Sequence, residues 1–164
     1  MEKKKVVAVY AGTFDPVTNG HLDIIERASQ IFDTLYVTIS INPIKKELFS
    51  VEERLKMLQE VTKKFDNVII DTSTQLTVEY AKSIGAKVLV RGLRATMDFE
   101  YELQLAFANQ YLDDNIEMAF LMTRASHAFI SSSTVKEIAM HHGPIDELAP
   151  KCVCQALKEK FSEK

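Results

Sequence analysis

The stretch VVAVYAGTFDPVTNGH, residues 6–21, decides the fold of this chain. Its first part, VVAVY, is short, apolar and rich in β-branched residues, which is typical of a strand buried in a parallel sheet. The residues that follow, AGTFDPVTNGH (11–21), include two glycines, two threonines and a proline, and they end at His21. Since a strand-to-helix connection usually has about 2–6 residues, this composition predicts a loop that holds a small anionic ligand.

The same strand-like pattern recurs along the chain and alternates with helical patterns. Apolar runs occupy 5–11, 35–41, 67–71, 87–91 and 116–122, and helical periodicity occupies 21–32, 50–65, 78–85, 98–112, 132–142 and 152–162. Strands that alternate with helices indicate right-handed βαβ crossovers. The sequence therefore predicts an α/β fold over residues 1–164, a single domain with one doubly wound five-stranded parallel sheet and a C-terminal helix.

Local signals indicate several helix ends. Ser50 and Glu53 have the spacing of a capping box, and so have Thr134 and Glu137. Gly85 is expected to end the third helix, because glycine readily adopts the left-handed conformation that often follows a helix.

Composition and charge argue against several classes of protein. The 164 residues carry 20 basic and 23 acidic side chains, a net charge of −3, which argues against broad nucleic-acid binding. No apolar run approaches the ~20 residues that span a bilayer, and the first residues are too strand-like for a signal peptide. Cys152 and Cys154 are expected to be reduced thiols on a helix, with a disulfide or a metal site as the alternative, so a cytoplasmic location is predicted.

Four loops are expected to meet at one edge of the sheet. They follow the first, second, fourth and fifth strands and read GTFDPVTNGH (12–21), NPIKKELF (42–49), RGLRATMD (91–98) and TRASHAFISSS (123–133). In an open parallel sheet, ligands bind beyond the carboxyl ends of the strands, near the point where the strand order reverses. Each loop carries hydroxyl, basic or imidazole groups, so their convergence predicts a ligand site.

Two of these loops lead into predicted helix starts. His21 lies at the first turn of one helix, and the serine run 131–133 begins another. Unpaired N–H groups and the helix dipole favour anions at such positions. The structural alternatives are a histidine packed against the strand and an ordinary serine N-cap.

The other two loops carry pairs of cations. Arg91 and Arg94 lie on either side of a glycine, and each can bind phosphate oxygens in a bidentate way. Lys45 and Lys46 follow an Asn-Pro turn. The alternatives are a salt-bridge network between the arginines and the acidic residues of 98–102, and solvated lysines on the surface.

These residues favour chemistry at phosphorus without a general base. The sequence contains no GxxxxGK[ST] loop and no GxGxxG after a strand, and no pair of carboxylates stands out for acid–base catalysis. A phosphate nucleophile is already ionised near neutral pH. Its attack on another phosphorus therefore depends mainly on positioning and on neutralisation of charge.

Two motifs resemble those of the nucleotidyltransferase superfamily: TNGH (18–21) has the form (H/T)xGH, and ISSSTVKE (130–137) is similar to the (I)SSTxxR element. Together with YAGTFDP (10–16), NPIKKELF and RGLRATMDFEYE (91–102), they resemble the bacterial phosphopantetheine adenylyltransferases over essentially the whole chain. The resemblance implies a Rossmann-like nucleotidyltransferase fold, Mg²⁺ as cofactor and a homohexamer. It also implies reversible adenylyl transfer from ATP to 4′-phosphopantetheine, which gives dephospho-coenzyme A and pyrophosphate in the penultimate step of coenzyme A synthesis.

The resemblance also implies roles for individual residues. His21, Lys45 and Arg94 are expected to be catalytic, with His21 and Lys45 acting as positively charged donors to the reacting phosphates. The implied contacts with ATP are Thr13, Phe14, His21, Gly92, Leu93, Arg94, Glu102, His127, Ala128, Phe129, Ile130, Ser131, Ser132 and Ser133. The implied contacts with phosphopantetheine are Thr13, Lys45, Thr77 and Arg91, and no protein ligand to a metal is implied.

Two other functions stay open at the level of the sequence. The general motifs also permit an adenylyl- or cytidylyltransferase that acts on nicotinamide mononucleotide, FMN or glycerol phosphate, although RGLRATMDFEYE argues against it. A non-catalytic nucleotide-binding regulator that has kept the cleft is the second alternative. A panel of acceptor substrates tests the first alternative, and pyrophosphate release tests the second.

Overall fold

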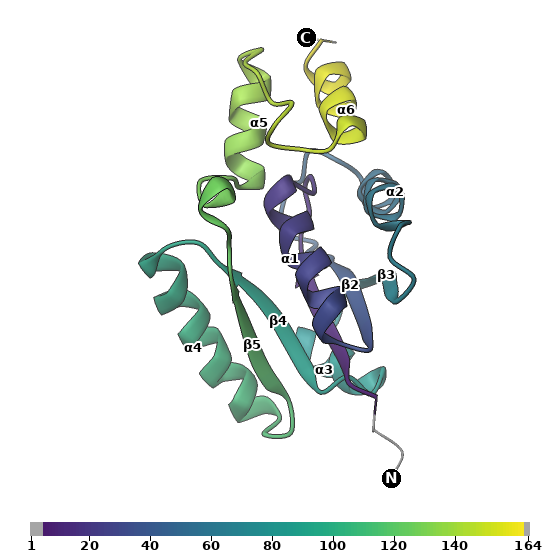
Figure 1. Ribbon diagram of the computed structural model, residues 1–164, viewed down its shortest axis with the longest axis vertical. Helices are drawn as coiled ribbons and strands as arrows, with labels where there is room; N and C mark the ends of the chain where they lie inside the picture. The colour runs from purple at the N-terminus through teal and green to yellow at the C-terminus, as the bar shows by residue number, and fades with distance from the viewer. Residues whose placement is uncertain (1–4, 163–164) are drawn as a thin grey trace.

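The computed structural model describes residues 5–162, apart from the side chains of Thr96 and Met97. Its strands are β1 (Val7–Gly12), β2 (Thr34–Ser40), β3 (Val68–Ser73), β4 (Val88–Leu93) and β5 (Glu117–Met122). Its helices are α1 (Asn19–Ile31), α2 (Val51–Thr62), α3 (Thr77–Ser83), α4 (Thr96–Leu112), the short 3₁₀ helix η1 (Ala125–His127), α5 (Ser132–Met140) and α6 (Lys151–Ser162). Strands and helices alternate as the sequence predicts (Figure 1).

The five strands form one parallel sheet in the order β3-β2-β1-β4-β5, which confirms the predicted doubly wound α/β fold. From β1 the chain moves outward through β2 to β3, and it then crosses back to place β4 on the other side of β1. The strand order therefore reverses between β1 and β4, in the middle of the sheet.

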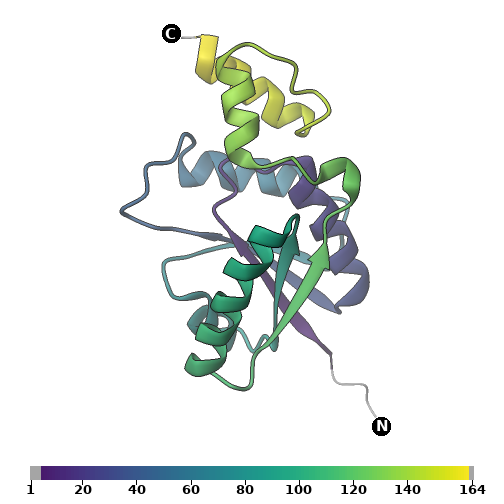
Figure 2. The same cartoon turned by 90° about the vertical axis from the view of Figure 1, so that its left-hand side faces the viewer.

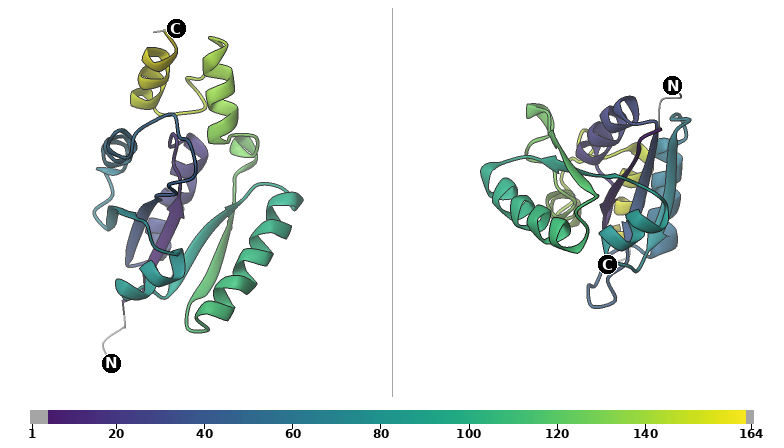
Figure 3. Two further views of the ribbon diagram at one scale, coloured as in Figure 1. Left: turned by 180° about the vertical axis from the view of Figure 1, so that it is seen from behind. Right: turned by 90° about the horizontal axis from the view of Figure 1, so that it is seen from below.

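Helices cover both faces of the sheet (Figure 3). Ala8 and Tyr10 of β1 belong to the larger hydrophobic cluster, which packs one face of the sheet against α1 and α2 and continues into α5 and α6. Val9 and Ala11 belong to a smaller cluster on the opposite face, with α3. This alternation follows from the two-residue period of a strand. Burial on both faces explains why the strand sequences are apolar almost throughout.

The helices α5 and α6 lie beyond the carboxyl ends of the strands, at the end of the molecule opposite to the start of β1 (Figures 1 and 2). Val135 of α5 and Val153 and Leu157 of α6 are fully buried in the larger cluster. These two helices therefore extend the hydrophobic core past the edge of the sheet, and they bring the start of α5 close to the loops that leave the strands.

One predicted helix end is wrong. The capping box of α2 is confirmed, and Gly85, with φ +71°, follows α3 as expected. The box predicted at Thr134 and Glu137 does not cap α5, because this helix begins earlier. Ser131 is its N-cap, and the Ser131 hydroxyl accepts a hydrogen bond from the Thr134 amide. The serine run thus forms the helix start itself.

The structure bears on two predictions about the class of protein. None of the described helices combines the length and the apolar character needed to cross a membrane. Cys152 and Cys154 lie on α6 with free thiols, the first half-buried and the second buried. Within residues 5–162, no three or more His, Cys, Asp or Glu side chains are grouped so as to hold a metal ion.

β1 and β4 separate toward their carboxyl ends. β1 is registered with β2 over six residue pairs, whereas it shares only two with β4, both near the start of each strand. Further along, the carbonyl of Ala11 accepts a hydrogen bond from Arg91 Nη1 at 3.0 Å. A side chain of β4 thus takes the place of a backbone hydrogen bond between the two strands. The opening coincides with the reversal of strand order, which is where ligands bind in sheets of this kind.

Candidate active site

A cavity of ≈ 360 Å³ opens at the reversal between β1 and β4. Its walls come from the loops after β1, β2, β4 and β5 and from the first turns of α1, α4 and α5. The lining residues are Tyr10, Ala11, Gly12, Thr13, Phe14, Asp15, Thr18, Gly20, His21, Ile24, Lys45, Lys46, Arg91, Gly92, Arg94, Asp98, Glu102, Thr123, Ile130, Ser131, Ser132, Ser133 and Lys136. The predicted convergence of the four loops is therefore confirmed.

His21 is held in place at the start of α1. Thr18 is the N-cap of this helix, and its amide donates to His21 Nδ1 at 3.0 Å, while the His21 amide donates to Thr18 Oγ1 at 3.3 Å. The Phe14 ring packs edge-on against the imidazole, with 5.0 Å between the ring centroids. Because Nδ1 accepts a hydrogen bond, the ring proton is on Nε2, which makes this atom the donor that the imidazole offers to a ligand.

The surroundings keep the His21 imidazole uncharged. Burial, followed by the positive charges of Arg94 and Arg91, lowers its pKa from 6.5 to about 4. The guanidinium groups of Arg91, near the end of β4, and Arg94, in the loop after it, disfavour a third positive charge on this ring. The role of His21 as a positively charged donor to bound phosphates, which the resemblance implies, stays a prediction.

Arg91 is paired with Glu102 of α4. Its Nε and Nη2 each donate to one carboxylate oxygen at 2.7 Å, and its Nη1 donates to the carbonyl of Ala11. The salt-bridge alternative is therefore confirmed for this pair. It leaves room for a ligand, because a guanidinium has five N–H donors and only three are used here. Both oxygens of Glu102 are engaged with Arg91, so this carboxylate lines the cavity mainly as a counter-ion.

The loop after β4 is tied to the serine segment and to α1. Arg94 donates from Nε to Asp98 at 3.0 Å and from Nη1 to the carbonyl of Ile130 at 3.2 Å. At Gly92, an added Cβ would lie 3.1 Å from the side chain of Ile24, so the absence of a side chain lets β4 pack closely on α1. These contacts fix the distance between the arginines and the start of α5.

The start of α5 presents hydrogen-bond donors to the cavity. Ser131 is the N-cap, and the Ser132 hydroxyl donates to the carbonyl of Pro16 at 2.8 Å, which ties the helix start to the β1 loop. The amides of Ser132 and Ser133 belong to the first turn, where a helix has no carbonyl to pair with them. Together with the positive end of the helix dipole, they favour a bound anion.

The cavity lining has a local excess of positive charge. Its five cations are Lys45, Lys46, Arg91, Arg94 and Lys136, and its three carboxylates are Asp15, Asp98 and Glu102. Each carboxylate is paired with a cation: Asp15 with Lys136, Asp98 with Arg94, and Glu102 with Arg91. The remaining two cations are the exposed lysines of the β2–α2 loop. A chain of net charge −3 thus concentrates positive charge at this one edge.

Five predicted site residues lie outside the lining of the cavity. They are Leu93, which is buried in the core, Thr77, which begins α3, and His127, Ala128 and Phe129, which lie between β5 and α5. Phe129 is 61% exposed. Ligand contacts by these residues stay predictions.

Lys136 is the principal lining residue that the sequence reasoning missed. It lies on α5, three residues after Ser133, and its Nζ is 2.9 Å from a carboxylate oxygen of Asp15. A signal for it was present, because residues three apart on a helix share one face, so a lysine at this spacing faces the same way as the serine run. The contacts of Asp15 give no such signal, since the sequence does not show which amides its carboxylate meets.

Comparisons with known proteins agree with this geometry. The family model for cytidylyltransferase-like proteins matches residues 9–138. The phosphopantetheine adenylyltransferase of Carboxydothermus hydrogenoformans is 53% identical over 157 residues, which cover 96% of this chain and 97% of that protein. A crystal structure from Vibrio parahaemolyticus, assigned as a nicotinate-nucleotide adenylyltransferase, shares the fold with a TM-score of 0.70 at 18% identity, covering 94% of this chain and 99% of the other. The chain therefore belongs to the cytidylyltransferase-like family of nucleotidyltransferases and, within it, to the phosphopantetheine adenylyltransferases.

Proposed function

We propose that this chain catalyses the reversible transfer of the adenylyl group from ATP to 4′-phosphopantetheine, forming dephospho-coenzyme A and pyrophosphate. The similarity to the phosphopantetheine adenylyltransferase of Carboxydothermus hydrogenoformans along nearly the whole chain supports this reaction. The structural observation that carries the proposal is the meeting of His21, Arg94 and the serine-capped start of α5 around one cavity. All three are donors suited to phosphate oxygens.

The proposed reaction is a displacement at the α-phosphorus of ATP. A phosphate oxygen of the acceptor forms the new bond to this phosphorus, the bond to the oxygen that bridges to the β-phosphorus breaks, and pyrophosphate leaves with the bonding electrons. Because the attacking phosphate is already ionised near neutral pH, no side chain has to remove a proton. Catalysis then depends on holding the reactants in line and on stabilising negative charge as it develops.

The donors around the cavity suit two different parts of this transition state. His21 Nε2–H and the ammonium of Lys45 are proposed to stabilise the non-bridging oxygens of the α-phosphate. Arg94 and the first-turn amides of Ser132 and Ser133 are proposed to stabilise the departing pyrophosphate. A hydrogen bond supports this division, since Arg94 donates to the carbonyl of Ile130, the residue that precedes the serine run.

The acceptor phosphate is proposed to bind near Arg91 and Thr13. Arg91 keeps two N–H donors beyond those used for Glu102 and Ala11. Thr77 lies after β3, on the same edge of the sheet but outside the cavity lining, so it is proposed to contact the pantetheine arm. The segment 127–129 adjoins the lining at its serine end, and it is proposed to contact the nucleoside of ATP together with Leu93.

Magnesium is expected from the family resemblance, but the described residues do not fit a resident metal ion. Each of the three carboxylates of the cavity is already paired with a basic side chain of the protein. Residues 5–162 hold no group of three or more His, Cys, Asp or Glu side chains placed to bind a metal. Mg²⁺ usually keeps several waters and binds through substrate phosphates. We therefore propose that Mg²⁺ enters as a complex with the triphosphate of ATP.

A homohexamer and a cytoplasmic location are proposals from the same resemblance. The helix α4 supports self-association, because five of its large side chains are exposed: Phe99 45%, Tyr101 64%, Phe107 62%, Tyr111 90% and Leu112 46%. Several large apolar side chains exposed on one helix commonly meet a partner. Light scattering after size-exclusion chromatography should give six times the 18.6 kDa of one chain, and cell fractionation tests the location.

A pyrophosphate-release assay tests the proposed reaction. The protein is incubated with ATP, Mg²⁺ and 4′-phosphopantetheine, and in parallel with nicotinamide mononucleotide, FMN or glycerol phosphate as acceptor. A second series replaces ATP with CTP. Turnover is expected only with ATP and phosphopantetheine. A preference for another acceptor would assign a different reaction, and ATP binding without turnover of any acceptor would favour the non-catalytic regulator.

A variant of one residue serves as the control for contaminating activity. His21→Ala removes the Nε2–H donor, so it should release pyrophosphate at least ~100-fold more slowly than the wild type. ATP affinity should change less than turnover, because the lost donor acts mainly in the transition state.

A further inference from the structure

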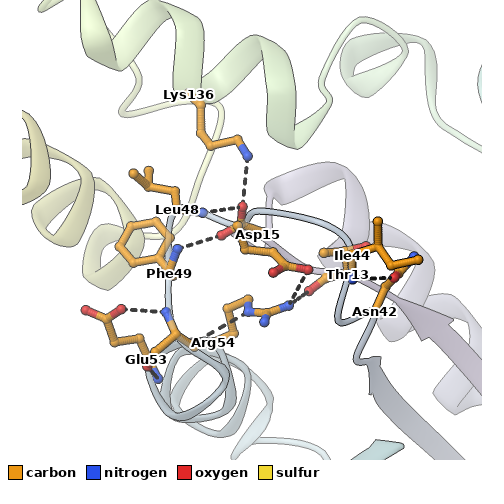
Figure 4. Close-up of polar contacts among 11 residues, drawn as sticks. Thr13, Asp15, Asn42, Ile44, Leu48, Phe49, Glu53, Arg54 and Lys136 are labelled. Carbon is orange, nitrogen blue, oxygen red and sulfur yellow. Dashed lines mark hydrogen bonds and ion pairs between the residues drawn. The ribbon is translucent and has the colours of Figure 1, made fainter. Parts of the chain in front are cut away.

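The Asp15 carboxylate lies where three segments meet (Figure 4). The residue is only 4% exposed. Its Oδ2 accepts from the amide of Leu48 and from the ammonium of Lys136, each at 2.9 Å, and its Oδ1 accepts from the amide of Phe49 at 2.9 Å. Burial alone would raise the pKa of this carboxyl, but Lys136 and the two amides outweigh burial and lower the pKa. The group is therefore ionised at neutral pH.

Lys45 lies on the loop that Asp15 anchors. One end of this loop is held at Ile41, whose amide donates to a carbonyl of β3 at 2.8 Å. The other end is held at Leu48 by Asp15. Between them the chain forms an exposed turn, in which the Lys45 amide donates to the carbonyl of Asn42 at 3.1 Å. The place of Lys45 at the cavity thus depends on how the two ends are held, and Asp15 holds the end that is three residues away.

Arg54 of α2 supports the same corner. It is 2% exposed, and it donates from Nη1 to the carbonyl of Thr13 at 2.9 Å and from Nε to the carbonyl of Ser50 at 3.3 Å. Thr13 and Asp15 are two residues apart in the β1 loop, so this loop contacts α2 through the carbonyl of Thr13 and the end of the Lys45 loop through the carboxylate of Asp15 (Figure 4). The Lys45 loop and the β1 loop are therefore built as one unit, with Asp15 as the charged contact.

We propose that Asp15 is a positioning residue for adenylyl transfer, which sets the place of Lys45 in the cavity without touching the substrates. This inference rests on the proposed function. A carboxylate directed at phosphates would repel them, whereas both oxygens of Asp15 are occupied by donors of the protein. A displacement of about 1 Å in a group that contacts the reacting atoms can cost ~10²-fold in rate. The flexible side chain of Lys45 compensates in part, so a smaller loss is expected.

Asp15→Asn tests this role. The amide keeps the shape of the side chain but has one acceptor oxygen in place of two, so at least one donor loses its partner. We expect kcat to fall by about 10-fold and the KM for ATP to change by less than about 3-fold. In a Lys45→Ala background the same substitution should lower kcat by less than about 2-fold, because the group that Asp15 positions is gone.

Asp23→Asn is the matched control. Asp23 lies on α1, its side chain is 5% exposed, like that of Asp15, and it also pairs with cations, Arg27 at 3.1 Å and Arg124 at 3.0 Å. Its partners lie away from the Lys45 loop. Asp23→Asn should change kcat by the same factor in the wild-type protein and in the Lys45→Ala variant, because the free-energy effects of separate sites add.

Amide hydrogen exchange measured by NMR gives a readout that does not depend on activity. Asp15→Asn should speed exchange at Leu48 and Phe49 by at least about 10-fold and leave Ile41 unchanged. If Asp15→Asn does not fold, Asp15→Glu takes its place in every arm, because it keeps the charge but moves the carboxylate outward by one methylene.

The outcomes separate the two proposals. Equal losses of kcat from Asp15→Asn in the presence and absence of Lys45 would overturn the positioning role, and so would unchanged exchange at Leu48 and Phe49. If the wild-type protein releases no pyrophosphate, while amide exchange in Asp15→Asn is faster at Leu48 and Phe49 as expected, the proposed function is overturned. The conclusion that Asp15 holds the end of the Lys45 loop is then kept.

Discussion

Replacing His21 with glutamine should remove a defined part of the protein's sensitivity to acid. In the wild type, Nδ1 of the ring accepts from the Thr18 amide, and burial together with Arg94 and Arg91 lowers the pKa from 6.5 to about 4. Glutamine at this third position of the helix can still reach back to the N-cap amide, as it does in a capping box, but it does not titrate. The two proteins therefore differ mainly in one protonation.

The direction of the effect follows from the two pKa values of His21. The unfolded chain binds a proton at this residue below about pH 6.5, whereas the folded chain binds it only below about pH 4. The stability of the wild type is therefore undiminished above pH 6.5 and decreases as the pH falls toward 4. The whole gap corresponds to about 3 kcal/mol, of which about 2 kcal/mol is lost between pH 7.5 and 5.0.

Urea denaturation of both proteins at pH 7.5 and 5.0, followed by circular dichroism, measures this loss. The free energy of unfolding of the wild type, relative to His21→Gln, should fall by about 2 kcal/mol between the two pH values. An NMR pH titration of the histidine rings gives the pKa directly, with His21 assigned by its absence from the spectrum of the variant. A His21 pKa near 6.5, or the same pH dependence in both proteins, would refute the conclusion that burial and the two arginines lower this pKa.

Three further changes test other parts of the site. Lys45→Ala should lower turnover by ~10²–10³-fold and also weaken phosphopantetheine binding; unchanged steady-state kinetics would show that Lys45 is only a solvated surface residue. Glu102→Gln leaves Arg91 without its counter-ion in a half-buried place, so the free energy of unfolding in urea should fall by about 2 kcal/mol, and an unchanged value would contradict the pairing. EDTA should abolish turnover without shifting the midpoint of thermal unfolding, since Mg²⁺ is proposed to bind with ATP, whereas a lower midpoint would reveal a resident metal.

The order of strands and helices could be predicted because the apolar period changes sharply along the chain. The run 5–11 is mostly apolar and contains three valines, as suits a strand buried on both faces, and 21–32 repeats apolar residues at helical spacing. The partial pairing of β1 and β4 could not be predicted in this way. It depends on the register between strands that lie far apart in the sequence, and no local pattern encodes that register.

The residues that line the site could be predicted where the topology of the sheet decides their position. The carboxyl ends of parallel strands share an edge, so Lys45, Arg91 and Ser131 were expected to meet, and they line one cavity. The charge of His21 was not predictable, because it depends on burial and on arginines that arrive from another loop. The contacts of Asp15 were hidden for the same reason, since its partners lie more than thirty residues away.

The three carboxylates that line this cavity have a common physical role. Five unpaired cations at one edge would repel one another in the empty protein, and pairing three of them reduces that repulsion and holds the paired cations in place before a ligand arrives. The excess is left on Lys45 and Lys46, which lie on the exposed β2–α2 loop. Incomplete neutralisation also suits a reversible reaction, because a cavity that fully neutralised pyrophosphate would hold its product.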